Sequence, residues 1–153
     1  MITVLLIVHG LLAVALLGAL THQSFSVFRS PSGGKKGFVE RFRGVNGPTF
    51  VYAVVLIFLV TSLGGGLLYP QYRIDVRTTL EDLQLRAANG VFEIKEHLVA
   101  VGLGLLPAYA YYWRLPLNPG TVVARKAVTW MLAGIVWWSY LVGHVLNNIK
   151  GLL

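Results

Sequence analysis

The stretch TFVYAVVLIFLVTSLGGGLLY, residues Thr49–Tyr69, decides the fold because it contains no charged side chain along its whole length. A helix needs about 20 consecutive apolar residues to cross the hydrocarbon core of a bilayer. Three other predominantly apolar runs are Ile2–Leu20, Val91–Trp113 and Ala127–Leu146. We therefore predict an all-α integral membrane protein, a transmembrane four-helix bundle that forms a single domain over residues 1–153 and uses these four runs as its spans.

The composition agrees with a membrane protein. Hydrophobic residues make up 56% of the chain and charged residues 12%, whereas about a quarter of the residues in a soluble domain are charged. This excludes an ordinary cytosolic enzyme, and the short loops leave no room for a separate soluble catalytic domain. The chain has no cysteine, which excludes disulfides, iron–sulfur clusters, thiolate zinc sites and covalently attached haem c. The first run has no basic segment before it, so we expect a retained span and not a cleaved signal peptide.

The loops between the predicted spans differ in their charges. The first and third are basic, with Arg29, Lys35, Lys36, Arg41 and Arg43 in the first and Arg114, Arg125 and Lys126 in the third. Because basic loops stay in the cytoplasm, we predict that both termini lie on the outer, periplasmic side of a bacterial cytoplasmic (inner) membrane. The net charge of +7 follows from this asymmetry, so we expect no nucleic-acid partner.

The second loop mixes acidic and basic residues and has no proline or glycine over Tyr72–Ala88. Its apolar residues, Leu80, Leu83 and Leu85, predict a short amphipathic segment that lies on the outer surface of the membrane.

Three of the four histidines fall at one depth of the predicted bundle. His9, His97 and His144 each lie a few residues from the outer end of a span, while His22 lies at the cytoplasmic end of the first span. Ionisable side chains are costly inside a membrane and normally face the interior of a bundle, so each of the three is a functional candidate.

Helical periodicity predicts the surroundings of these histidines. The His97 face of the third span carries a stripe of small residues, Ala100, Gly104 and Ala108. The His144 face of the fourth span is aromatic, with Trp130, Ala133, Trp137 and Tyr140. The run Gly64–Gly66 in the second span indicates a close contact or an opened turn.

These features favour haem b held by two imidazoles, because haem iron takes one ligand on each porphyrin face. We predict His97 as one ligand, with His9 or His144 opposite. Glu93, one turn before His97, is predicted to orient it through a hydrogen bond, and Arg73 is a candidate partner of a haem propionate. The predicted function is an electron-transfer protein or a subunit of a respiratory-type membrane complex. Its partners would be the lipid bilayer and other membrane subunits or a redox partner, with quinone a candidate. No catalytic residue is assigned, and whether the chain is an enzyme stays open.

A family resemblance points the same way. The first helix with His9, the segment FEIKEH at residues 92–97, and the closing residues Tyr109, Tyr112, Trp113 and Arg114 together resemble the HemJ/CopD-like membrane proteins of four or five helices. The resemblance covers about half the chain. It implies a haem b or metal role for His9 and His97 and a functional role for Lys95.

Other functions fit the same residues. His97, His9 and His144 with Glu93 offer donors for a bare iron, copper or zinc ion, or for a path that carries protons or metal ions. Alternatively, the histidines tie helices together in a non-catalytic structural subunit of a larger complex. We expect Lys95 and Glu96 to form a solvated first helical turn, and the tryptophans and tyrosines to be interfacial or packing residues.

Overall fold

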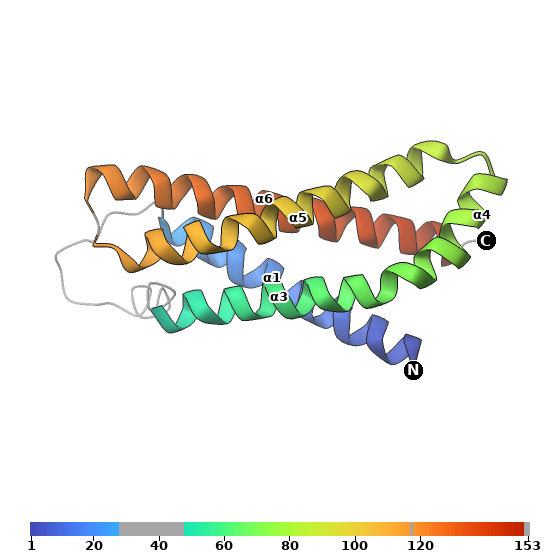
Figure 1. Cartoon of the computed structure of the whole chain (residues 1–153), viewed down its shortest axis with the longest axis horizontal. Coiled ribbons are helices and arrows are strands. Elements are labelled where there is room, and N and C mark those ends of the chain that lie inside the picture. The colour runs from blue at the N-terminus through green and yellow to red at the C-terminus, as the bar shows by residue number, and fades with distance from the viewer. Residues whose placement is uncertain (28–47, 117, 152–153) are drawn as a thin grey trace.

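The computed structural model describes residues 1–27, 48–116 and 118–151. Four long helices dominate this part of the chain: α1 (Ile2–Val27), α3 (Pro48–Gln71), α5 (Arg86–Arg114) and α6 (Pro119–Gly151) (Figure 1). The described residues contain no strand, so the predicted all-α class is confirmed. The first loop, with the basic residues on which the predicted topology depends, lies outside the described residues.

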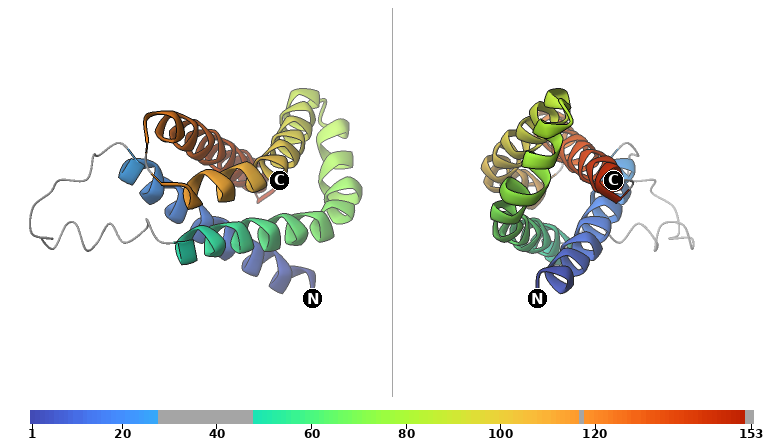
Figure 2. Two further views of the ribbon diagram at one scale, coloured as in Figure 1. Left: turned by 60° about the vertical axis from the view of Figure 1, so that its left-hand side comes forward. Right: turned by 90° about the vertical axis from the view of Figure 1, so that its right-hand side faces the viewer.

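The four long helices form a ring. α1 packs against α3 and α6, and α5 packs against the same two helices, so α1 and α5 face each other across the diagonal (Figure 2). The beginning of α1 and the end of α6 lie at the same end of the bundle (Figure 1). We call this end the terminal half, and the end that holds the connections after α1 and α5 the loop half. The side of the membrane that each half faces stays a prediction.

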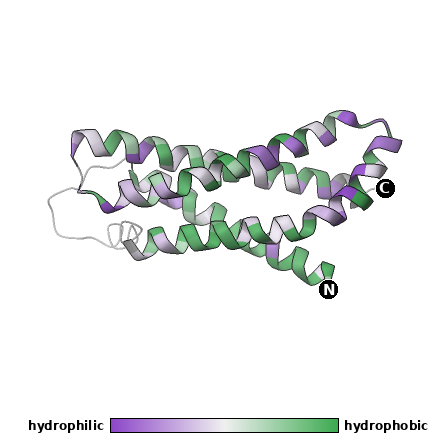
Figure 3. Cartoon of the chain, in the orientation of Figure 1, coloured by the Kyte–Doolittle hydropathy of each residue, from purple (hydrophilic) through white to green (hydrophobic). Residues whose placement is uncertain are grey.

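Three helical segments are long and apolar enough to cross a membrane: Ile2–Val27, Thr49–Asp82 and Pro119–Asn148. α5 is not among these segments, and it carries Glu93, Lys95 and Glu96 toward its start and three tyrosines and Arg114 toward its end (Figure 3). Three of the four predicted spans are therefore supported by helix length and composition. A membrane crossing by α5 stays a prediction that rests on its place between α3 and α6.

The second loop is helical. A π-helical turn, η2 (Tyr72–Val76), and the short helix α4 (Arg77–Asp82) continue directly from α3. The π turn follows Pro70, which lies inside α3 and has no amide hydrogen to donate. Leu80 is buried against Phe92 and Leu146, whereas the other two leucines of the predicted amphipathic pattern, Leu83 and Leu85, are exposed. The segment is helical, and one residue of its apolar set packs on the bundle. Its place on the outer surface of the membrane stays a prediction.

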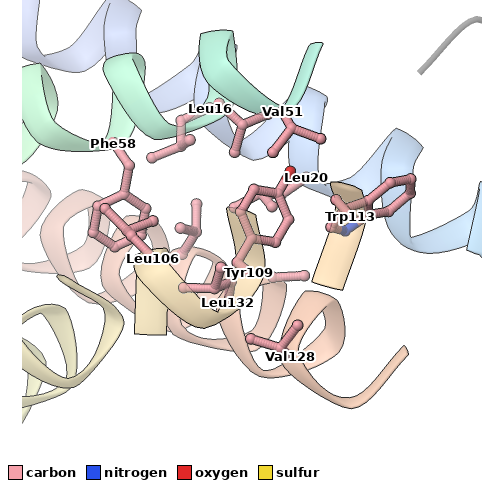
Figure 4. Close-up of a cluster of buried hydrophobic side chains, with 12 residues drawn as sticks. Leu16, Leu20, Val51, Phe58, Leu106, Tyr109, Trp113, Val128 and Leu132 are labelled. Atoms are coloured by element: carbon pink, nitrogen blue, oxygen red, sulfur yellow. The ribbon is translucent and has the colours of Figure 1, made fainter. Parts of the chain in front are cut away.

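The main core lies in the loop half. Its largest members come from all four long helices and are Leu16, Leu20, Val51, Phe58, Leu106, Tyr109, Trp113 and Leu132 (Figure 4). A Cβ added at Gly102 would lie 2.6 Å from Cζ of Phe58, so only a glycine lets the Phe58 ring approach α5 this closely. In contrast, the first 14 residues of α1 and the last 11 of α3 include no buried side chain.

The connection between α5 and α6 is held by Arg125, which is 7% exposed. Its guanidinium donates hydrogen bonds to the carbonyls of Tyr112, at 3.0 Å, and Leu115, at 2.5 Å. These carbonyls belong to the end of α5, where backbone acceptors lack partners within the helix. Arg125, predicted as a cytoplasmic loop residue, therefore lies inside α6 and caps α5.

Candidate functional site

His9 points into the bundle from the terminal half of α1. It lies on the same face of α1 as Leu16, Leu20 and Gln23, which are buried. The imidazole rests on α3: a Cβ at Gly64 would lie 3.3 Å from Nδ1 of His9, and a Cβ at Gly65 would lie 3.3 Å from Cε1. The close contact predicted for the glycine run is confirmed at these two positions.

One nitrogen of this ring lacks a partner. Nδ1 of His9 is buried and makes no hydrogen bond within the part of the chain that the structure describes. The backbone carbonyl of Thr61 is the main-chain group that interacts with the His9 ring. The Thr61 hydroxyl is not a partner of the ring, because it donates its hydrogen bond to the Ile57 carbonyl at 2.7 Å. Nδ1 of His9 is therefore buried, and no hydrogen bond from this atom holds the ring in place.

Lys95 and Glu96 of α5 form an ion pair on the opposite side of the interior. Their Nζ and Oε1 atoms are 2.6 Å apart, and the two side chains are 16% and 32% exposed. The Lys95 ammonium also lies 4.3 Å from the centroid of the Phe92 ring. The charges of both residues act on His9. Lys95 lies on the same face of α5 as the buried Gly102, so the expected solvated first turn is wrong for Lys95, whereas Glu96 is half-buried at the edge of that face.

His97 lies on another face of α5. It follows Glu96 by about 100° and Lys95 by about 200° around the helix, and its side chain is exposed. Nδ1 of His97 lies 2.8 Å from the carbonyl oxygen of Glu93, so this nitrogen donates the hydrogen bond. Glu93 thus orients His97 through its backbone carbonyl and not through its carboxylate. The carboxylate pairs with Arg77 instead, at 3.5 Å from Nη1.

The other predicted residues are spread over the bundle. His144 is exposed, with Nε2 3.1 Å from Nδ2 of Asn148, and its ring is parallel to that of Tyr140. Arg73 is exposed in η2, with its guanidinium carbon 5.9 Å from the centroid of the Tyr69 ring. His22 lies in the loop half, as predicted. Within the described ranges, no three His, Asp or Glu side chains are gathered closely enough to hold a metal ion.

The loop half contains a buried polar cluster that sequence reasoning did not identify. The Tyr109 hydroxyl donates a hydrogen bond to Oε1 of Gln23, and both side chains are 0% exposed. Nearby, the Trp113 indole donates to Thr129 at 3.0 Å, and Thr129 donates to the carbonyl of Arg125 at 2.7 Å. Gln23 could have been predicted from the sequence, because a side-chain amide on the apolar Leu16–Leu20 face of α1 is costly in lipid and is expected to face the interior of the bundle.

No family model, curated protein or solved structure matches this chain. The resemblance to HemJ/CopD-like proteins therefore stays a prediction.

Proposed function

We propose that this chain is a membrane subunit that binds and transfers protons at a cluster formed by His9, Lys95 and Glu96. The observation that carries the proposal is the position of His9, whose Nδ1 atom is buried without a partner beside the half-buried ion pair of Lys95 and Glu96. Among the functions predicted from the sequence, this arrangement favours a proton path, because ionisable groups inside membranes commonly form proton relays.

The chemistry follows from the two nitrogens of imidazole. A neutral ring donates from one nitrogen and accepts at the other. Leaving a buried polar atom unpaired costs about 1–3 kcal/mol, so His9 does not act as a structural tie through Nδ1. A proton taken from water onto this ring changes its charge from zero to +1 and makes both nitrogens donors.

A titration of the His9 ring tests this proposal. The full chain, labelled with ¹⁵N-histidine in lipid nanodiscs, gives ring signals that can be assigned by replacing each histidine in turn with glutamine. We expect the His9 ring to bind its proton about tenfold more tightly in Lys95→Gln and about tenfold less tightly in Glu96→Gln, because each variant removes one nearby charge.

Glu93→Gln is the matched control. Its carboxylate is on the same turn of α5 but pairs with Arg77, so we expect the proton affinity of His9 to change by less than about twofold. A His9 ring that does not titrate, or that titrates identically in all three variants, contradicts the proposal.

A second function, haem b binding for electron transfer, is favoured by the geometry of His97. The hydrogen bond from Nδ1 to the Glu93 carbonyl fixes the ring and leaves Nε2 directed away from its own helix, the arrangement typical of metal-binding histidines. Gly104 lies two turns further along the same face of α5, and a Cβ there would meet nothing within 4 Å. Because His9 points to the interior, the opposite ligand would come from a neighbouring subunit or a second copy of this chain. A bound haem would supply one-electron transfer.

A pyridine haemochrome assay and a reduced-minus-oxidised spectrum of the membrane complex test the haem function. We expect His97→Ala to abolish haem b binding and His22→Ala to retain it, because His22 lies in the other half of the bundle. Equal haem content in the two variants, or no haem b assignable to the wild-type chain, rules out this second function and leaves the proton site unaffected.

A further inference from the structure

Two cavities adjoin the first turns of α5. One is an apolar groove of about 430 Å³ between α5 and α6. It is lined by Ala87, Ala88 and Val91 of α5 and by Trp138, Leu141 and Val145 of α6. The α6 side belongs to the membrane-spanning segment Pro119–Asn148. An occupant of this groove therefore comes from the lipid phase and is apolar where it contacts these side chains.

The other cavity is polar and has a volume of about 440 Å³. It is lined by Arg77, Glu81, Arg86 and Asn89. Arg77 is neutralised, since its Nε lies 2.7 Å from Oε1 of Glu81. Among the described residues, Arg86 contacts no carboxylate, and its guanidinium donates to the neutral side-chain oxygen of Gln84 at 3.5 Å. The polar cavity thus carries a net positive charge at Arg86.

The two cavities lie on opposite faces of the same turn of α5. Arg86 lines the polar cavity and the next residue, Ala87, lines the groove. They are separated by roughly one helix diameter, about 10–12 Å. A molecule with an anionic head and an apolar chain can occupy both cavities at once.

We propose that these cavities form a binding site for an anionic glycerophospholipid, with an acyl chain in the groove and the phosphate at Arg86. A guanidinium binds phosphate oxygens through two parallel hydrogen bonds. A quinone carries no charge and leaves the Arg86 charge unpaired. The anionic lipid is thus the occupant that satisfies both cavities.

Native mass spectrometry of the full chain tests this site. The chain is released from vesicles that contain equal amounts of phosphatidylglycerol and phosphatidylcholine, two lipids with the same acyl chains and different head-group charge. We expect the wild type to retain phosphatidylglycerol in preference, and Arg86→Gln to reduce that preference by roughly tenfold, because a charged hydrogen bond is lost.

Two further variants separate the head group from the chain. Val145→Trp, at an exposed position, fills the groove and is expected to reduce the retention of both lipids. Arg73→Gln removes a loop arginine that lines neither cavity and is expected to behave as the wild type. Equal retention of the two lipids by the wild type, or equal effects of Arg86→Gln and Arg73→Gln, overturns the proposal. Co-purification of an isoprenoid quinone that Val145→Trp displaces also overturns it.

Discussion

The loop half and the terminal half of this bundle are built from the same four helices, yet they use buried polar groups differently. In the loop half, Tyr109 is fully buried and its hydroxyl is bonded to Gln23 within a continuous apolar core. In the terminal half, His9 lies in a region with few buried neighbours, and its Nδ1 has no partner among the described residues. In the loop half, Nε2 of Gln23 and Oγ of Ser24 are also buried without a partner among the described residues. The two halves therefore differ in the kind of group that is left unpartnered: an amide and a hydroxyl in the loop half, and an imidazole that can bind a proton in the terminal half.

The largest expected difference between the halves is in the cost of truncating an apolar side chain. Leu132 is 0% exposed in the main core, and Leu6 in the terminal half is 47% exposed. We expect Leu132→Ala to lower the free energy of unfolding by about 2–5 kcal/mol and Leu6→Ala by less than about 0.5 kcal/mol. Reversible unfolding in mixed detergent micelles measures both. Similar losses would show that the two halves are equally well packed.

A smaller effect is expected at the contact between α3 and α5. Because a Cβ at Gly102 would meet the Phe58 ring at 2.6 Å, Gly102→Ala is expected to cost about 1–3 kcal/mol of unfolding free energy. Gly104→Ala is the matched control, since a Cβ there meets nothing within 4 Å. The same unfolding measurement compares them, and an unchanged stability in Gly102→Ala would mean that Phe58 can move aside.

The buried hydrogen bond of the loop half contributes less than the packing around it. Tyr109→Phe keeps the ring and leaves the Gln23 amide oxygen without its donor, so we expect a loss of about 1–2 kcal/mol. Tyr111→Phe removes a hydroxyl from an exposed ring and is expected to change stability by less than about 0.5 kcal/mol. If both variants unfold alike, the Tyr109–Gln23 bond does not stabilise the fold.

The smallest change in stability is expected at the glycine contact of the terminal half. A Cβ at Gly64 would displace Nδ1 of His9, while a Cβ at Gly66 meets nothing within 4 Å. We expect Gly64→Ala to alter the ¹⁵N chemical shifts of the His9 ring and to cost less than about 1 kcal/mol, and Gly66→Ala to alter neither. Unchanged His9 shifts in Gly64→Ala would show that the imidazole does not rest on α3.

The sequence predicted the helices better than the faces that they present. Apolar runs of about 20 residues define helices by length alone, so α1, α3 and α6 were identified correctly, although each extends beyond its predicted apolar run. The close approach at Gly64 and Gly65 was also predicted, because glycines gathered in one helix need a partner that fits against them.

The candidate site was predicted less completely because depth in the membrane does not determine direction around a helix. His9, His97 and His144 were grouped by depth, and the structure directs His9 inward and leaves the other two exposed. Lys95 and Glu96 were expected at the surface from their charge. The inward direction of Lys95 follows from the rotation of α5, which is set by Phe92 and Gly102 packing against neighbouring helices and cannot be read from local residue types.

The capping of α5 by Arg125 has a consequence for how the protein is made. A segment as polar as the start of α5 partitions poorly into lipid by itself, whereas α6 is apolar enough to do so. Because Arg125 of α6 holds the Tyr112 and Leu115 carbonyls at the end of α5, the turn between the two helices is closed without help from α1 or α3. In the predicted topology, in which α5 also crosses the membrane, the two helices are suited to insert together as a hairpin, because the apolar α6 partitions into lipid more favourably than α5.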